Sequence, residues 1–150
     1  MQIELTEQIF NPWERIQHHE EKKISSHECG AVATFIGKMR NHNEGDQVSQ
    51  LFLEHYPGMT ENYLTSIGQT ALQRWKIPDI LIIHRIGLIT PGETIVLVAT
   101  WSSHRAEALA ACRFLIEELK SQAPFWKKET TNKGQRWVTH NTPGTIEVNT

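Results

Sequence analysis

Apolar residues recur along this chain with two different periods, which together predict strands interleaved with helices. Alternating or short continuous apolar runs predict strands at residues 31–36, 48–55, 80–86 and 94–101. Between residues 60 and 76 the apolar residues Leu64, Ile67, Ala71, Leu72 and Trp75 recur at spacings of 3, 4, 1 and 3, as in an amphipathic helix. A second long helix is expected to begin at Ser103 as its cap and to end before Pro124.

Shorter signals complete the outline of the fold. Asn11 followed by Pro12 is typical of a helix start and predicts a short helix over residues 13–20. Two short strand candidates, residues 125–130 and 135–138, flank Lys133-Gly134 and predict a C-terminal hairpin. Turn-joined strands with two long helices indicate an α+β fold, a sandwich of antiparallel strands rather than a doubly wound parallel sheet.

Composition narrows the class of protein. The 150 residues suit one domain over residues 1–150, ending in a loose tail at 139–150, and 15 basic against 17 acidic side chains give a net charge of −2. This balance disfavours a general nucleic-acid binder. Apolar runs stay far below the roughly 18 residues of a membrane span, and the first residues lack the pattern of a signal peptide. We therefore expect neither nucleic acid nor membrane as a partner.

The thiols and imidazoles give no sign of a metal or a disulfide framework. Cys29 and Cys112 are the two cysteines, and they form no CxxC pair, which fits a cytoplasmic protein. The eight histidines form no HExxH motif. We expect no metal and no cofactor.

One candidate site is the predicted start of the second long helix, where Ser103, His104 and Arg105 follow a strand. Unpaired backbone N–H groups and the helix dipole favour an anion there, and a guanidinium beside an imidazole would strengthen a phosphate or carboxylate site. The alternative is an ordinary capped helix with a solvated histidine and arginine.

A second candidate site is formed by Lys120, Lys127 and Lys128 on the two sides of the break at Pro124. A reversal from helix to strand can bring Lys120 and Lys127 into one pocket, and lysines that are buried together lower each other's pKa. The alternative is that Lys120 stabilises the helix C-terminus while the other two lie in solvent. Residues 101–137 carry seven basic and four acidic side chains, which suits a small anionic ligand.

Five strings in the sequence resemble one family. They are residues 30–43 (GAVATFIGKMRNHN), 53–59 (LEHYPGM), 84–87 (HRIG), 103–105 (SHR) and 123–129 (APFWKKE). In this order and spacing, over about residues 29–138, they resemble the large, catalytic subunit of molybdopterin synthase. The resemblance implies an α/β-hammerhead fold.

The same resemblance implies a function and partners. Members of the family make the molybdopterin dithiolene from cyclic pyranopterin monophosphate (precursor Z), an anionic pterin, in molybdenum cofactor biosynthesis. The sulfur arrives as a thiocarboxylate on the C-terminal Gly-Gly of a small ubiquitin-like subunit. Two large subunits form a homodimer at the centre of a heterotetramer, and the pocket of one copy can borrow residues from the other.

The family's functional positions carry over to residues of this sequence. Lys120 and Lys127 match the catalytic lysines. The positions that match the substrate pocket are Lys38, Met39, Arg40, His104, Arg105, Lys128 and Glu129. The first 28 residues and the tail after Val138 match the family only loosely.

Three other functions remain open on the sequence alone. A phosphate- or nucleotide-binding module would use His104 and Arg105 without depending on Lys120. A cysteine-dependent sulfurtransferase would depend on Cys29 or Cys112. An RNA-binding role for the Trp- and Lys-rich last third is a further alternative, one that salt-dependent binding to oligonucleotides would reveal.

Overall fold

A computed structural model describes residues 1–25, 27–139 and 143–146. Its first sheet has four strands in the order β1-β5-β7-β2. The strands are β1 (Gln2–Thr6), β2 (Ala31–Lys38), β5 (Asp79–Arg85) and β7 (Thr94–Ser102). The two central strands, β5 and β7, are buried along their whole length. Their apolar runs therefore follow from cover on both faces rather than on one.

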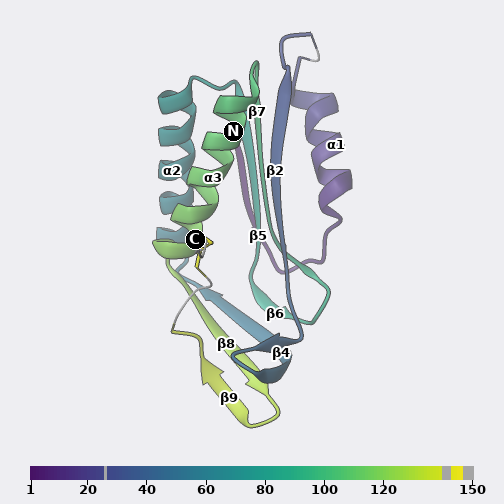
Figure 1. The fold of residues 1–150 in the computed structure, drawn as a ribbon, viewed down its shortest axis with the longest axis vertical. Coiled ribbons are helices and arrows are strands. Elements are labelled where there is room, and N and C mark those ends of the chain that lie inside the picture. Colours follow the sequence, from purple (N-terminus) through teal and green to yellow (C-terminus); the bar gives the residue numbers. More distant parts are fainter. Residues whose placement is uncertain (26, 140–142, 147–150) are drawn as a thin grey trace.

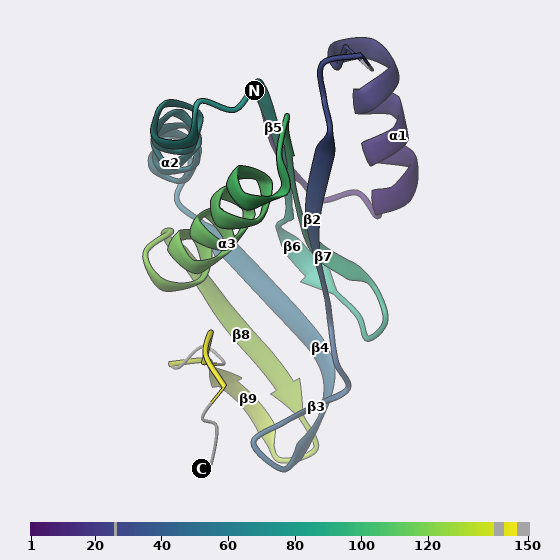
Figure 2. The same cartoon turned by 45° about the horizontal axis from the view of Figure 1, so that its top comes forward.

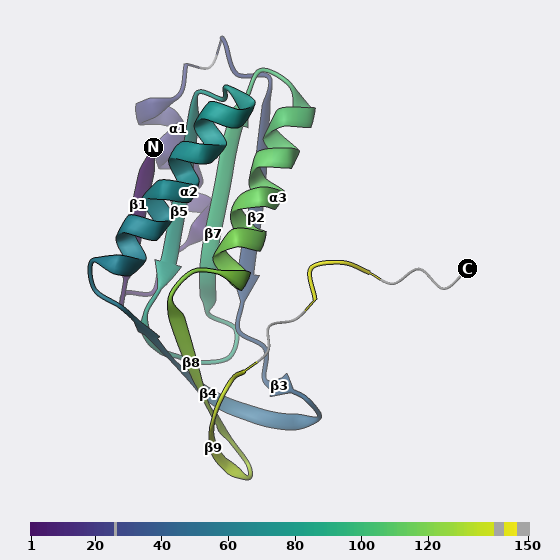
Figure 3. The ribbon, with the colours of Figure 1, turned by 90° about the vertical axis from the view of Figure 1, so that its left-hand side faces the viewer.

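Three helices cover this sheet (Figures 1 and 3). The helices α2 (Met59–Trp75) and α3 (Arg105–Ser121) lie side by side on one face, and α1 (Pro12–Lys23) lies on the other. The main core lies under α2 and α3, where Leu64, Ala71 and Leu115 are fully buried. A smaller core around Leu97 and Trp101 lies under α1.

The helix starts confirm one prediction and correct another. Asn11 caps α1, because its side-chain oxygen accepts hydrogen bonds from the backbone N–H groups of Trp13 (3.0 Å) and Glu14 (3.4 Å). The prediction that Ser103 caps α3 is wrong: His104 occupies the N-cap and makes no side-chain capping bond. The Ser103 hydroxyl instead donates to the backbone oxygen of Glu28.

A second sheet extends from the lower end of the first (Figure 2). Its order is β3-β4-β8-β9, and β6 also pairs with β4. The strands are β3 (His42–Asn43), β4 (Asp46–His55), β6 (Gly87–Ile89), β8 (Phe125–Thr131) and β9 (Gly134–Trp137). The antiparallel β8–β9 pair is the expected C-terminal hairpin.

The structure confirms an α+β fold but corrects its strand arrangement. The strands were expected to be antiparallel, yet β1 pairs with β5 in parallel, and Ile3 lies opposite Ile82. The prediction missed β1 because its five residues carry only two apolar side chains, Ile3 and Leu5, and because its partner is far away in the sequence. The described strands therefore form one mixed sheet and one antiparallel sheet.

The helices in the described part of the chain are too short or too polar to cross a bilayer.

Candidate functional site

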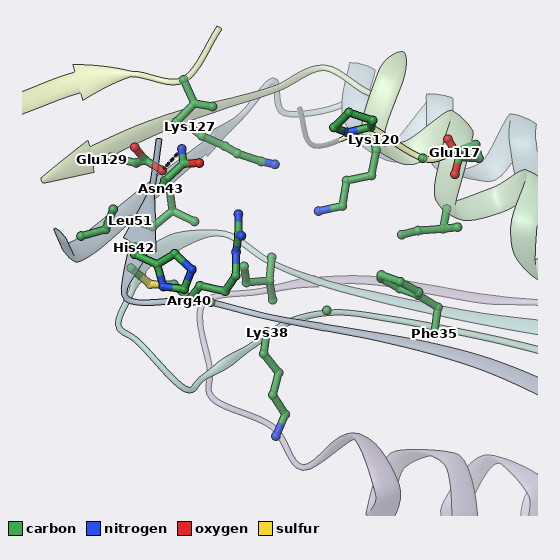
Figure 4. Close-up of a pocket in the computed structure, with 18 of the residues that line it drawn as sticks. Phe35, Lys38, Arg40, His42, Asn43, Leu51, Glu117, Lys120, Lys127 and Glu129 are labelled. Atoms are coloured by element: carbon green, nitrogen blue, oxygen red, sulfur yellow. Dashed lines mark hydrogen bonds between the residues drawn. The ribbon is translucent and has the colours of Figure 1, made fainter. Parts of the chain in front are cut away.

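A cavity of about 490 Å³ opens where the two sheets meet, between the end of β2, the strand β8 and the last turns of α3 (Figure 4). Apolar side chains form part of its wall, among them Phe35, Leu51 and Ile116. The polar residues that line it include Lys38, Arg40, His42, Asn43, Glu117, Lys120, Lys127 and Glu129. The cavity therefore combines an apolar wall with an excess of cationic groups.

Two lysines reach this cavity from different elements. Lys120 lies in the last turn of α3, whose apolar stripe is packed into the core by Ala111, Leu115 and Leu119. After the break at Pro124 the chain reverses into β8, which carries Lys127. In Figure 4 the two side chains extend toward each other across the cavity. The structure thus brings together the two lysines that the sequence placed on either side of a helix-to-strand reversal.

Burial changes the acid–base behaviour of both lysines. Loss of solvent around the amine, followed by the nearby charge of Lys127, lowers the pKa of Lys120 from 10.5 to about 7. Burial also lowers the pKa of Lys127, while a hydrogen bond with Lys120 and then the carboxylate of Glu129 oppose that shift. A substantial fraction of Lys120 is therefore an uncharged amine at neutral pH, and such an amine can act as a nucleophile or base.

A network of polar side chains holds Glu129 in the cavity wall. Glu129 is buried, and its carboxylate accepts hydrogen bonds from Asn43 Nδ2 (2.8 Å) and Arg136 Nε (3.1 Å). Arg136 also donates to Asp46 Oδ2 (2.8 Å) and to the backbone oxygen of Asn43 (3.0 Å). These bonds link β3, β4, β8 and β9. They hold the Glu129 carboxylate in place beside Lys127 and tie the strands of the second sheet to one another.

The three residues at the end of β2 differ in where their side chains go. Arg40 is exposed and points into the cavity, whereas the amine of Lys38 points away from it. Met39 is buried as part of the main core, and its backbone is bonded to Glu93 and Gly92. Of these three predicted substrate contacts, Arg40 is the one that places a cationic group in the cavity.

Alternation along β8 separates Lys128 from its neighbours. Lys127 and Glu129 face the cavity, so Lys128, one position from each, projects from the opposite face of the strand. There its amine lies 5.7 Å from the centre of the Trp137 ring. The structure therefore does not bring Lys128 into the cavity with the other two lysines.

His104 and Arg105 also lie outside this cavity within one chain. Both are exposed at the first turn of α3, while Lys120 lies in its last turn. At 1.5 Å per residue, the 15 steps from Arg105 to Lys120 span about 22 Å. One copy of the chain therefore cannot offer both ends of α3 to the same small ligand.

A second, smaller cavity of about 160 Å³ borders the same lysines. It shares Lys120, Lys127 and Val138 with the larger cavity. Its other lining residues are His84, Leu119, Ser121, Ala123, Phe125 and Thr139. The amines of Lys120 and Lys127 therefore lie between two cavities of different size.

Sequence reasoning missed several residues of the site. Asn43 and Arg136 fix Glu129, and Phe35 and His42 line the larger cavity. Phe35, His42 and Asn43 belong to the string at residues 30–43, so the sequence marked them as part of the resemblance but did not indicate what they do. For Arg136, neither spacing nor motif indicated that it would meet a carboxylate on the neighbouring strand.

The positions of the two cysteines and of the possible metal ligands do not suggest a catalytic centre. Cys112 is buried in the core of α3, and burial raises the pKa of its thiol to about 11. Cys29 donates to the backbone oxygens of Ala31 and Ser102, away from the lysines. Among the described residues, no three His, Cys, Asp or Glu side chains gather closely enough to hold a metal ion.

Comparison with known proteins assigns this chain to a family. The sequence model of the family described as "MoaE protein" matches residues 10–122, about three quarters of the chain. The chain therefore belongs to the MoaE family, the family of the catalytic subunits of molybdopterin synthase, which are sulfurtransferases of molybdenum cofactor biosynthesis.

Particular relatives agree with this assignment. The molybdopterin synthase catalytic subunit of Ralstonia nicotianae is 57% identical over 111 residues, which cover 74% of this chain and 63% of that protein. The crystal structure of molybdopterin synthase from Staphylococcus aureus matches with a TM-score of 0.82 and 31% identity, over 93% of this chain and 98% of that one.

A more distant neighbour shows the same fold. It belongs to a complex of subunits 1 and 2 of the molybdopterin-converting factor from Helicobacter pylori, with a TM-score of 0.77 and 17% identity. The match covers 93% of this chain and 92% of that one.

Proposed function

We propose that this chain transfers sulfur from the C-terminal thiocarboxylate of a small ubiquitin-like subunit to cyclic pyranopterin monophosphate, forming the molybdopterin dithiolene. The observation that carries the proposal is a pair of half-buried lysines, Lys120 and Lys127, that lie between two cavities. The pKa of Lys120 is lowered to about 7. Family membership supplies the reaction, and this geometry supports its location in the chain.

The two lysines have separate roles in this proposal. Lys120, with its lowered pKa, lies nearest the incoming thiocarboxylate and acts on its carbonyl carbon as an uncharged amine. Lys127 lies beside the carboxylate of Glu129, which favours its protonated form. As an ammonium group, Lys127 donates a proton or stabilises the negative charge that develops on oxygen. Neither cysteine has a role, since the partner subunit brings the sulfur.

The two cavities fit the two reactants. The larger cavity has room for a pterin, an apolar wall at Phe35 and a guanidinium at Arg40 that can pair with a phosphate. The smaller one has a volume of only about 160 Å³, and the small side chains of Ser121 and Ala123 line it. A Gly-Gly tail has no side chains and suits such a space. We therefore place the pterin in the larger cavity and the tail in the smaller one, with the lysines between them.

A second copy of the chain would complete the site. The strand β2 is at the edge of its sheet, and its apolar side chains Val32 and Phe35 are 45% and 37% exposed. The start of β2 lies beside the first turn of α3, and its end leads to Arg40. Two copies that pack β2 against β2 in opposite directions would bring His104 and Arg105 of one copy to the cavity of the other.

This homodimer accounts for the residues that one chain leaves apart. His104 and Arg105 would add positive charge to the larger cavity beside Arg40, where the phosphate of the substrate is expected. Lys38, Lys128 and Met39, which do not present charge to the cavity, are then peripheral to binding rather than direct contacts. The small subunits would dock at the two outer ends of the dimer, as the heterotetramer of the family implies, and the family's α/β-hammerhead description would apply to the first sheet and its helices.

A reconstitution experiment tests the function. The purified chain is mixed with a thiocarboxylated small subunit and cyclic pyranopterin monophosphate, and the dithiolene product is measured. We expect product only when both proteins are present, and we expect alkylation of Cys29 and Cys112 to leave it unchanged. Binding of the phosphate substrate without product would indicate an anion-binding module, and loss of activity on alkylation would indicate a cysteine-dependent enzyme.

A further inference from the structure

The motif at residues 84–87 (HRIG) contains one residue with no role in the account so far. His84 lies near the end of β5 and is only 1% exposed. It lines the smaller cavity together with Lys120 and Lys127. The other two distinctive residues of the motif have structural roles: Arg85 pairs with Glu93 (3.1 Å), and Gly87 has a φ of +77° at the turn into β6. His84 alone joins the motif to the lysines.

The hydrogen bond of His84 to its own strand defines the tautomer of the ring. Its Nδ1 lies 2.7 Å from the backbone oxygen of Arg85, and a carbonyl oxygen can only accept. Nδ1 therefore carries the proton, which leaves Nε2 as an acceptor in the neutral ring. Burial, aided by the charges of Lys120 and Lys127, lowers the pKa of His84 to about 3. The ring thus stays neutral throughout the physiological pH range.

Packing fixes the plane of the imidazole ring. His84 stacks on Phe125, with 4.1 Å between ring centres and 16° between planes. Phe125 is two positions before Lys127 on β8, and the two side chains share one face of that strand. The imidazole is therefore held by a backbone bond on its own strand and by an aromatic ring on the strand that carries a lysine.

From this arrangement we propose that His84 is a positioning residue, whose unprotonated Nε2 faces the smaller cavity and accepts a hydrogen bond from the amine of Lys120. The charged groups that act on His84 are Lys120 on α3 and Lys127 on β8. Glu129 on β8 acts in turn on Lys127, and Arg85, the next residue on β5, is paired with Glu93. A neutral acceptor orients an amine without adding a third positive charge to the pair. The consequence for catalysis rests on the proposed function, whereas the hydrogen bond does not.

Two substitutions separate this role from simple packing. His84→Asn keeps a side-chain N–H near the Arg85 carbonyl but has no acceptor at the position of Nε2, whereas His84→Gln can place an oxygen there. The pH dependence of Lys120 labelling by an amine-reactive reagent, read by peptide mass spectrometry, reports the lysine directly. The single-turnover rate of sulfur transfer reports how well Lys120 works in the reaction.

The proposal predicts opposite behaviour of the two variants. An acceptor favours the ammonium form, so His84→Asn should move the labelling midpoint of Lys120 down from about 7 by roughly half a unit. We expect kcat to fall about tenfold with KM unchanged, and His84→Gln to restore both values. A wild-type midpoint in His84→Asn would overturn the proposal, as would equal impairment of both variants together with a lowered Tm. A shifted midpoint without sulfur transfer in the wild type would instead refute only the proposed function.

The unmodified protein offers a test that does not depend on folding of the variants. Imidazole ¹⁵N resonances should show His84 protonated at Nδ1 from pH 5 to 9. The Nε2 resonance should change with a midpoint of about 7 as Lys120 titrates. Protonation at Nε2, or an Nε2 resonance that does not respond to pH, would contradict the proposal.

Discussion

A lysine amine on the surface is protonated at neutral pH, and burial changes this for Lys120. Its environment lowers the pKa from 10.5 to about 7, mostly through loss of solvent and then through the charge of Lys127. Lys128, in contrast, lies beside Trp137 on the outer face of β8. The same side chain can therefore have different reactivity within a few residues, because the local packing differs.

The pH dependence of the reaction follows from this pKa. Sulfur transfer that uses the uncharged amine of Lys120 should rise as the pH increases through about 7, where the amine loses its proton. The measurement is the single-turnover rate from pH 5.5 to 9 with saturating partner. A rate that keeps rising toward the ordinary lysine value of 10.5 would show that Lys120 is not perturbed in this way.

Stability should depend on pH for the same reason. The unfolded chain holds the Lys120 proton up to about pH 10.5, whereas the folded chain releases it near 7. Between these values the unfolded state binds more protons, so the unfolding free energy of the wild type should rise with pH relative to Lys120→Met. Urea unfolding of both proteins from pH 6 to 10 measures the difference. A constant difference across this range would contradict the shifted pKa.

At the scale of elements, the hairpin of β8 and β9 supports the site from outside. Arg136 on β9 bonds to Glu129 and Asp46, and through them it ties the hairpin to β4 and to the wall beside Lys127. The backbone oxygen of Asn43 is also one of its acceptors. The outer sheet is thereby coupled to the charge balance of the lysine pair, although Arg136 itself is 31% exposed.

Replacing Arg136 tests this coupling. Arg136→Met removes a partner of the buried Glu129 carboxylate, which should lower the stability of the fold and reduce sulfur transfer as well. Lys133→Met is a matched control on the same hairpin, because Lys133 pairs with Asp46 while 74% exposed. An ion pair this exposed adds little to stability, so Lys133→Met should keep the stability and the activity of the wild type. Equal effects of both substitutions on stability and rate would contradict the role of Arg136.

At the scale of the whole molecule, the two ends of α3 lie too far apart to share a ligand within one copy. The homodimer proposed above resolves this by pairing the first turn of one α3 with the last turn of the other. An active-site complementation experiment tests it with two inactive variants, Lys120→Ala and Arg105→Ala.

Mixing and subunit exchange should restore activity only if the site is shared. In a dimer with shared sites, each mixed dimer has one intact site, so an equal mixture should recover about a quarter of the wild-type activity. If Arg105 and Lys120 acted within the same copy, the mixture would stay inactive. Each variant exchanged with itself provides the baseline.

The sequence predicted local features better than long-range ones. The helices at Met59–Trp75 and Arg105–Ser121 and the hairpin at the C-terminus followed from periodicity and turn residues. The strand β1 was missed because its parallel partner β5 lies more than 70 residues away, and nothing local marks such a pairing.

The candidate site shows the same division. Spacing across Pro124 was enough to suggest that Lys120 and Lys127 converge, and the alternation of β8 could have placed Lys128 on the other face. The bonds from Arg136 to Glu129 and the stacking of His84 on Phe125 depend on how separate strands meet. Such contacts are set by tertiary packing and leave no periodic signal in the sequence.

The central claim is that Lys120 performs the chemistry, and one comparison tests it most directly. Dithiolene formation is measured with wild type, Lys120→Ala and Lys128→Ala, each with the thiocarboxylated small subunit and cyclic pyranopterin monophosphate. We expect Lys120→Ala to lose about 100-fold or more in rate while keeping its fold, and Lys128→Ala to stay near the wild type. Full activity of Lys120→Ala, or equal losses in the two variants, would contradict the account.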